Sequence, residues 1–92
     1  MKQSYKLPDY RGKCLSIRLK QNSYALGLND PRFEYQGGCL FIIGTVPQGA
    51  ALSNYALGAQ RAILWSRVTD YIVFDDLNSY SNASSISTQF QN

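Results

Sequence analysis

Apolar and polar residues alternate most clearly on either side of the pair Gly37-Gly38. The stretch 33–46 reads FEYQGGCLFIIGTV, and a glycine pair between two apolar-patterned arms is typical of a two-residue hairpin turn. We therefore predict a β-hairpin in which Gln36 faces Cys39 and Phe33 faces Ile42. One face then carries Phe33, Tyr35, Leu40, Ile42 and Val46, and the other carries Glu34, Gln36, Cys39, Phe41 and Ile43.

The first face is predicted to belong to the core, whereas the second carries both polar and apolar residues. The run 39–46 is apolar at nearly every position, which indicates a strand covered on both sides. Gly44 interrupts this run, and a strand glycine often marks a bulge or a close backbone approach. A bend at a barrel corner is the favoured interpretation, and a ligand contact is the alternative.

The remaining strands follow from shorter patterns. Residues 13–20 alternate, with Leu15, Ile17 and Leu19 predicted to face the core, while Cys14, Ser16, Arg18 and Lys20 face solvent. Residues 24–28 form a second predicted strand, which ends at the turn signal Asn29-Asp30-Pro31. The β-prone runs 62–65 and 71–74 are predicted to pair as a last hairpin.

Two segments lack a clear β pattern. Residues 50–60 combine helical spacing with Gly58, so that a short helix and an ordered loop are both open. The end of the chain is mostly polar, and we predict a flexible tail. The predicted organisation is an irregular basic arm over 1–12, a single β domain over 13–78 and a flexible polar tail over 79–92.

Length and composition agree with one mostly β domain. The chain has 92 residues, and its seven Tyr and four Phe favour sheet over helix. Over residues 13–76 the order of predicted strands resembles the small SH3-like or Sm-like barrels, on pattern alone and without a family motif. We predict such a barrel, or a strongly bent antiparallel sheet of five to six strands, with at most one short helix.

The sequence offers little catalytic chemistry. It contains no histidine, and its carboxylates fall at turns and strand ends, where solvated side chains are usual. Cys14 and Cys39 permit one disulfide, but no CxxC spacing indicates zinc. We expect neither an enzyme nor a bound cofactor or metal.

The expected location is cytoplasmic. The basic residues at the start of the chain are not followed by an apolar stretch, so we predict no secretory signal. No apolar run is long enough to span a membrane. In a reducing compartment the two cysteines are more readily interpreted as small apolar residues than as a bridge.

A protein interface is the predicted function. A second apolar face is expected to be formed by Phe41, Ile43, Trp65, Ile72 and Phe74, and a sheet of this size has difficulty covering it. The alternative is that residues 50–60 cover it within the same chain. We predict a non-catalytic binding or assembly module that forms a homo-oligomer or captures a protein partner.

Nucleic-acid binding is the alternative function. The first twenty residues hold six basic side chains and one acidic one, so a basic arm and first strand could follow a phosphate backbone. The predicted contacts are Lys13, Arg18, Lys20 and Tyr10. A solvated basic face explains the same charges without any partner. A third possibility is a small-molecule site beneath the long connection, lined by Trp65 or Tyr55.

Overall fold

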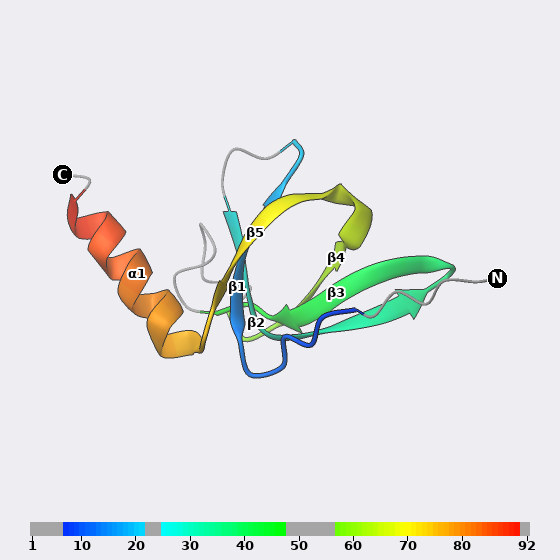
Figure 1. Cartoon of the computed structure of the whole chain (residues 1–92), viewed down its shortest axis with the longest axis horizontal. Coiled ribbons are helices and arrows are strands. Elements are labelled where there is room, and N and C mark those ends of the chain that lie inside the picture. Colours follow the sequence, from blue (N-terminus) through cyan, green and yellow to red (C-terminus); the bar gives the residue numbers. More distant parts are fainter. Residues whose placement is uncertain (1–6, 22–24, 48–56, 91–92) are drawn as a thin grey trace.

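The described part of the chain forms a five-stranded antiparallel sheet followed by one α-helix (Figure 1). The computed structural model describes residues 7–21, 25–47 and 57–90, with side chains up to residue 83. The strands are β1 (Cys14–Leu19), β2 (Ala25–Gln36), β3 (Cys39–Thr45), β4 (Gln60–Leu64) and β5 (Val68–Phe74). They lie in the order β4-β3-β2-β1-β5. The 3-10 helix η2 (Trp65–Arg67) joins β4 to β5, and the helix α1 is Leu77–Phe90.

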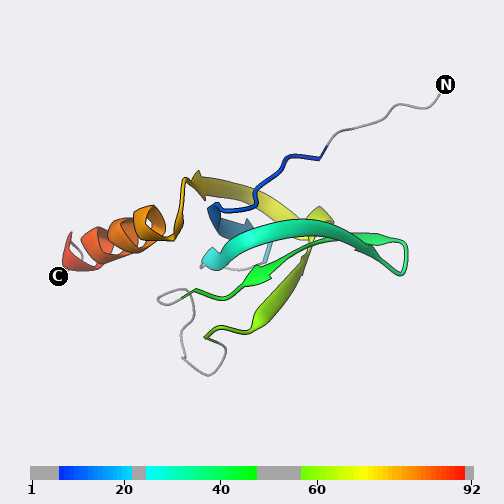
Figure 2. The same ribbon diagram turned by 90° about the horizontal axis from the view of Figure 1, so that it is seen from below.

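The hairpin of β2 and β3 has the predicted register. Gln36 pairs with Cys39 and Phe33 pairs with Ile42, and both turn glycines have positive φ, 59° at Gly37 and 83° at Gly38. These angles match a type I′ turn, whose twist follows that of the strands it joins. The hairpin tip extends beyond the rest of the sheet (Figure 2). Tyr35, predicted to lie in the core, is for this reason 69% exposed.

The predicted turn at Asn29-Asp30-Pro31 is wrong, because β2 runs through it as one strand with a bulge. The pairing of β2 with β3 shifts between Asn29 and Arg32. Asp30 has φ 53° and its carboxylate accepts a 2.8 Å hydrogen bond from the backbone N–H of Gly12. Pro31 is fully buried at the irregular position, where the missing proline N–H breaks no regular ladder.

Gly44 packs against this bulge. A Cβ atom at Gly44 would lie 2.8 Å from the carbonyl oxygen of Asn29 and 2.8 Å from Cγ of Leu28. Close backbone approach therefore explains the glycine that interrupts β3.

The predicted last hairpin is also wrong, since β4 and β5 lie at opposite edges of the sheet. β5 pairs with β1, so that Cys14 faces Phe74. In a flat sheet these edges would be about 19 Å apart, at about 4.8 Å per strand, whereas the three residues of η2 span roughly 6 Å. The sheet must therefore bend strongly. It stays open, and the barrel form of the prediction is wrong.

The larger of two buried clusters lies on the concave face of the bend. Its fully or nearly buried side chains come from the four strands β1, β2, β3 and β4, and they are Leu15, Ile17, Leu28, Ile42 and Ile63. Leu19 and Phe33 pack against them. The predicted inward face of β1 is thus confirmed.

Residues Leu77–Phe90 form α1, which begins just before the segment 79–92 that is predicted to be a flexible polar tail. The Asp76 carboxylate accepts a 2.9 Å hydrogen bond from the backbone N–H of Ser79, as a helix N-cap does. Tyr80 is buried in a second cluster with Cys14 and Val46. Cys14, predicted to face solvent, is covered in this way. Residues 48–56, which include most of the ambiguous segment and Tyr55, lie outside the described residues.

Candidate protein interface

The five predicted interface residues do not form one surface. Phe41 and Ile43 belong to β3, whereas Ile72 and Phe74 belong to β5. Strands β2 and β1 lie between them, a separation of roughly 14 Å along the sheet at about 4.8 Å per strand. The prediction assumed that the last two strands pair with each other. Their placement at opposite edges separates the residues.

Polar side chains extend over the outer face of β3. Arg32 of β2 pairs with Ile43 of β3, and Gln60 of β4 pairs with Thr45 of β3. The Arg32 guanidinium donates a 3.3 Å hydrogen bond to the Gln60 side-chain carbonyl, and Gln60 donates one of 3.3 Å to the Thr45 hydroxyl. Because Arg32 and Gln60 flank β3, their side chains meet above it. Ile43 is buried and Phe41 is half-buried.

Trp65 lies on the concave face. Its ring centroid is 4.9 Å from that of Phe33 and 5.4 Å from that of Tyr71, and the Phe33 contact is edge-to-face. Tyr10 extends this aromatic group, with its ring 5.8 Å from that of Tyr71. Edge-to-face and tilted contacts of this kind stabilise aromatic clusters. Trp65 is therefore half-buried and packs against the core of the sheet.

Phe74 is half-buried beneath α1. Its ring centroid is 5.6 Å from that of Tyr80, in an edge-to-face arrangement, and it packs on the cluster of Cys14 and Val46. Of the five predicted residues, Ile72 alone remains largely exposed, at 59%.

Ile72 belongs to an exposed sheet edge. Within the described residues β5 pairs with β1 on one side only, so half of its backbone N–H and C=O groups point away from the sheet. Val73, the next residue, is 42% exposed and lies on the opposite face of the strand. The edge therefore offers an apolar side chain on each face. The apolar run from Tyr71 to Phe74 is visible in the sequence. That this run forms an edge strand depends on the pairing of β5 with β1, which lies far away in the chain.

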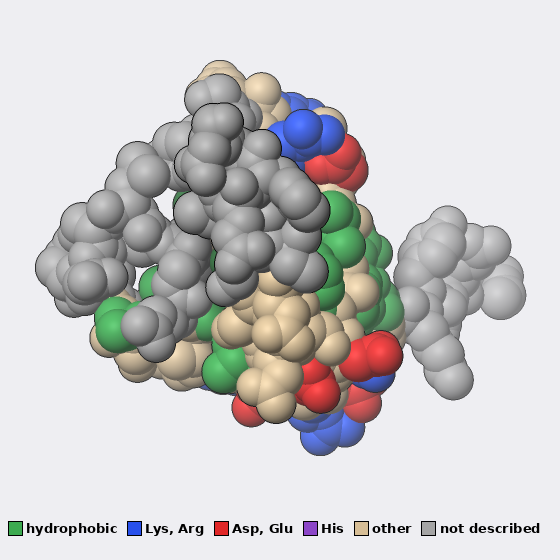
Figure 3. Space-filling view, turned by 90° about the vertical axis from the view of Figure 1, so that its left-hand side faces the viewer, with side chains coloured by type: hydrophobic (Ala, Val, Ile, Leu, Met, Phe, Trp, Pro, Cys, Tyr) green, Lys and Arg blue, Asp and Glu red, His purple; other side chains and the backbone are tan. Residues whose placement is uncertain are grey.

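A band of apolar side chains is visible on the side of the molecule along which β5 descends to α1 (Figures 1 and 3). Charged groups lie at both ends of this band. A shallow hollow of about 190 Å³ borders Ile72, and Ser16, Ala25 and Asp70 also line it. The surface next to the free edge is thus partly recessed and largely apolar.

Ion pairs neutralise the charges beside β5. The Arg18 guanidinium donates hydrogen bonds of 3.0 and 2.6 Å to the two carboxylate oxygens of Asp70. This bond lowers the pKa of Asp70 below its usual value. Lys13 lies 3.6 Å from the carboxylate of Asp75. Both pairs are exposed, so their contribution to stability is small.

Three of the four predicted nucleic-acid contacts therefore have protein partners. Arg18 and Lys13 are in the ion pairs just described, and the Tyr10 hydroxyl lies 2.7 Å from that of Tyr71. Lys20 is exposed and forms no ion pair with any residue in the described ranges. Most of the side chains predicted to contact nucleic acid are thus already paired with other side chains of the protein.

The cysteines are free, with Cys14 buried and Cys39 exposed. Burial raises the pKa of the Cys14 thiol to about 11, which keeps it protonated and unreactive at neutral pH. Among the residues with described positions, no three His, Cys, Asp or Glu side chains gather where a metal ion could bind. No helix in the described part of the chain has the length and apolar character needed to cross a membrane.

Comparison with known proteins gives no relative: no family model, curated sequence or solved structure matches this chain. The candidate site accordingly rests on geometry alone.

Proposed function

We propose that the protein is a non-catalytic assembly module that self-associates through the free edge of β5. The supporting observation is the exposure of Ile72 and Val73 on an edge strand whose outward backbone groups have no strand partner in the described residues. Such edges are usually blunted by charges, proline or covering elements, and an exposed apolar edge is a site of strand addition.

A second copy is the proposed occupant because the edge complements itself. Two copies of β5 related by a two-fold axis run antiparallel, as a closed dimer requires. With Ile72 opposite its own counterpart, each Val73 faces the partner's Tyr71. This register places the two Ile72 side chains, the most exposed apolar residues of β5, in contact, with directly opposed Cβ atoms about 5 Å apart. Asp70 is already neutralised by Arg18, which reduces the cost of placing it in the interface.

Light scattering across a range of protein concentrations tests the proposal. We expect a concentration-dependent dimer, and we expect Ile72→Lys to weaken it at least about tenfold, because burying an unpaired charge is costly. The control is Tyr35→Lys, which adds the same charge at the aromatic residue that is most exposed among those described. A wild-type protein that stays monomeric at millimolar concentration would contradict self-association and leave strand donation by another protein as the competing explanation.

The register has its own test. In a Cys39→Ser background, Ile72→Cys should form a disulfide-linked dimer under mild oxidation, since residues opposite across the two-fold axis come within bridging reach. Thr69→Cys, on the same strand but away from the axis, is the matched control. Equal cross-linking of the two variants would overturn the proposed register.

A further inference from the structure

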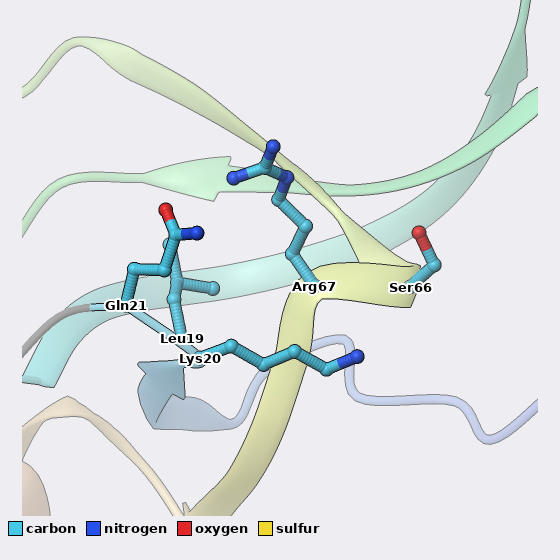
Figure 4. A pocket seen from close by; sticks show the side chains of 5 residues that line it. All are labelled: Leu19, Lys20, Gln21, Ser66 and Arg67. Atoms are coloured by element: carbon cyan, nitrogen blue, oxygen red, sulfur yellow. The ribbon is translucent and has the colours of Figure 1, made fainter.

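A basic hollow lies where the end of β1 meets η2. Leu19, Lys20 and Gln21 line it from β1 and the residues that follow, and Ser66 and Arg67 line it from η2 (Figure 4). Its volume is about 350 Å³, at the lower end of the range for small-ligand pockets. The backbone N–H of Lys20 donates a 3.1 Å hydrogen bond to the carbonyl of Arg67. This bond fixes the two cationic residues beside each other.

The charge of this hollow is not balanced from within the described chain. Seven Lys and Arg side chains have described positions, and four of them pair with carboxylates. Lys20 and Arg67 belong to the other three and share the hollow, whose lining includes no acidic residue. Asp70, three residues after Arg67, is already engaged by Arg18.

Two further lining residues carry neutral hydrogen-bond donors, and the fifth, Leu19, is apolar. Ser66 contributes a hydroxyl and Gln21 a side-chain amide, and both are exposed to solvent. In Figure 4 the side chain of Lys20 extends along η2 towards Ser66, while the side chain of Arg67 projects from the other side of η2. Both are long exposed side chains, so they can turn towards a common ligand by rotation about side-chain bonds alone. Guanidinium and ammonium groups beside hydroxyl and amide donors form a set suited to a tetrahedral oxyanion.

We propose that this hollow binds a phosphate group, with Arg67 and Lys20 as its counter-ions and Ser66 and Gln21 as neutral donors. The group can come from a free phosphate or from a nucleotide chain, and the chemistry of recognition is the same. The site is independent of the β5 edge.

Chemical-shift titration of the backbone amides tests the site with inorganic phosphate, pyrophosphate and a short single-stranded oligonucleotide, each at constant ionic strength and again at a higher one. We expect saturable shifts centred on Lys20, Gln21, Ser66 and Arg67. Arg67→Gln and Lys20→Gln should each weaken binding by about tenfold or more, since each removes a charge-assisted contact. Tighter binding of the oligonucleotide with a steep salt dependence identifies a nucleotide chain as the source. Equal or tighter binding of inorganic phosphate or pyrophosphate identifies free phosphate.

Arg11→Gln is the matched control, because it removes one exposed positive charge from an ion pair with Asp9 outside the hollow. It should leave the affinity within about twofold if the charges act locally. Loss of affinity equal to that of Arg67→Gln, shifts spread over other surfaces, or the absence of saturation with every probe would each overturn the proposal. Arg11, Lys20 and Arg67 are all exposed, so we expect the three variants to remain folded and any change in affinity to reflect the lost charge.

Discussion

The hydroxyl oxygens of Tyr10 and Tyr71 lie 2.7 Å apart, although 61 residues separate them in the chain. The bond joins the segment before β1 to the middle of β5, on the concave side of the sheet. The ring of Tyr10 also lies 6.2 Å from that of Phe33. The N-terminal segment thus helps to hold the last strand of the sheet.

Stability should fall at high pH partly through this pair. Burial, aided by the bond to Tyr71, raises the pKa of Tyr10 from 10.0 to about 12. A group with a raised folded-state pKa stabilises the protein below its unfolded value, so this contribution is lost as the pH rises from about 10 to about 12. Urea unfolding, followed by Trp65 fluorescence, should show that the free energy of unfolding falls more steeply between about pH 10 and about pH 12 in wild type than in Tyr10→Phe. At pH 7 the free energy of unfolding of Tyr10→Phe should be about 1 kcal/mol lower than that of wild type. Free energies of unfolding that fall in parallel with pH in the two proteins would contradict the prediction.

The two cysteines should differ sharply in reactivity. Cys39 is exposed at the hairpin tip, whereas Cys14 is buried and its thiol pKa is raised. One equivalent of a thiol reagent should react quickly with the native protein at pH 8, and the second only after unfolding. Cys39→Ser should remove the fast phase, as mass spectrometry of the labelled protein can check. Rapid native labelling of Cys14 would show that the cover provided by α1 is open in solution.

Gly44→Ala should destabilise the sheet by about 2 kcal/mol, a cost typical of overpacking. The added methyl group would be placed 2.8 Å from Leu28 and from the Asn29 carbonyl. Gly37→Asn provides the contrast, because nothing lies within 4 Å of a Cβ there and its φ of 59° suits asparagine. Chemical unfolding should place the second variant within about 1 kcal/mol of wild type. Similar losses for both variants would count against close packing at Gly44.

The docking of α1 depends on Tyr80, which is 7% exposed. Tyr80→Ala should cost about 3 kcal/mol, as is usual for truncating a buried aromatic residue. It should also accelerate the labelling of Cys14, which lies in the same cluster. Asn82→Ala, on an exposed position of the same helix, should change neither quantity. If Cys14 is labelled no faster in Tyr80→Ala, another segment provides its cover.

Local signals predicted the central part of the fold. The glycine turn set the register of β2 and β3 without reference to distant residues, and alternation identified the inward face of β1. The pairing of β5 with β1 has no such signal, because strands far apart in the chain are matched by the whole topology. The continuity of β2 was missed because Asp30 and Pro31 are also typical turn residues.

The candidate edge could be predicted only in part. The apolar character of Ile72 is evident in the sequence, but its exposure follows from the edge position of β5. Sequence reasoning placed Trp65 beside it, whereas η2 turns Trp65 into the core. Within the described side chains, the capping carboxylate of Asp76 and the docked ring of Tyr80 hold the helix, and the polar composition of the segment obscures both signals.

The pairing of the first strand with the last has a consequence for how the chain acquires its structure. During synthesis β1 emerges early and can pair with β2 soon afterwards, but its other edge has no partner until β5 has been made. Closing so long a loop costs entropy that no local contact offsets beforehand. Until β5 pairs with it, the outer edge of β1 is an unpaired strand edge, and association between chains at that edge competes with the pairing of β5.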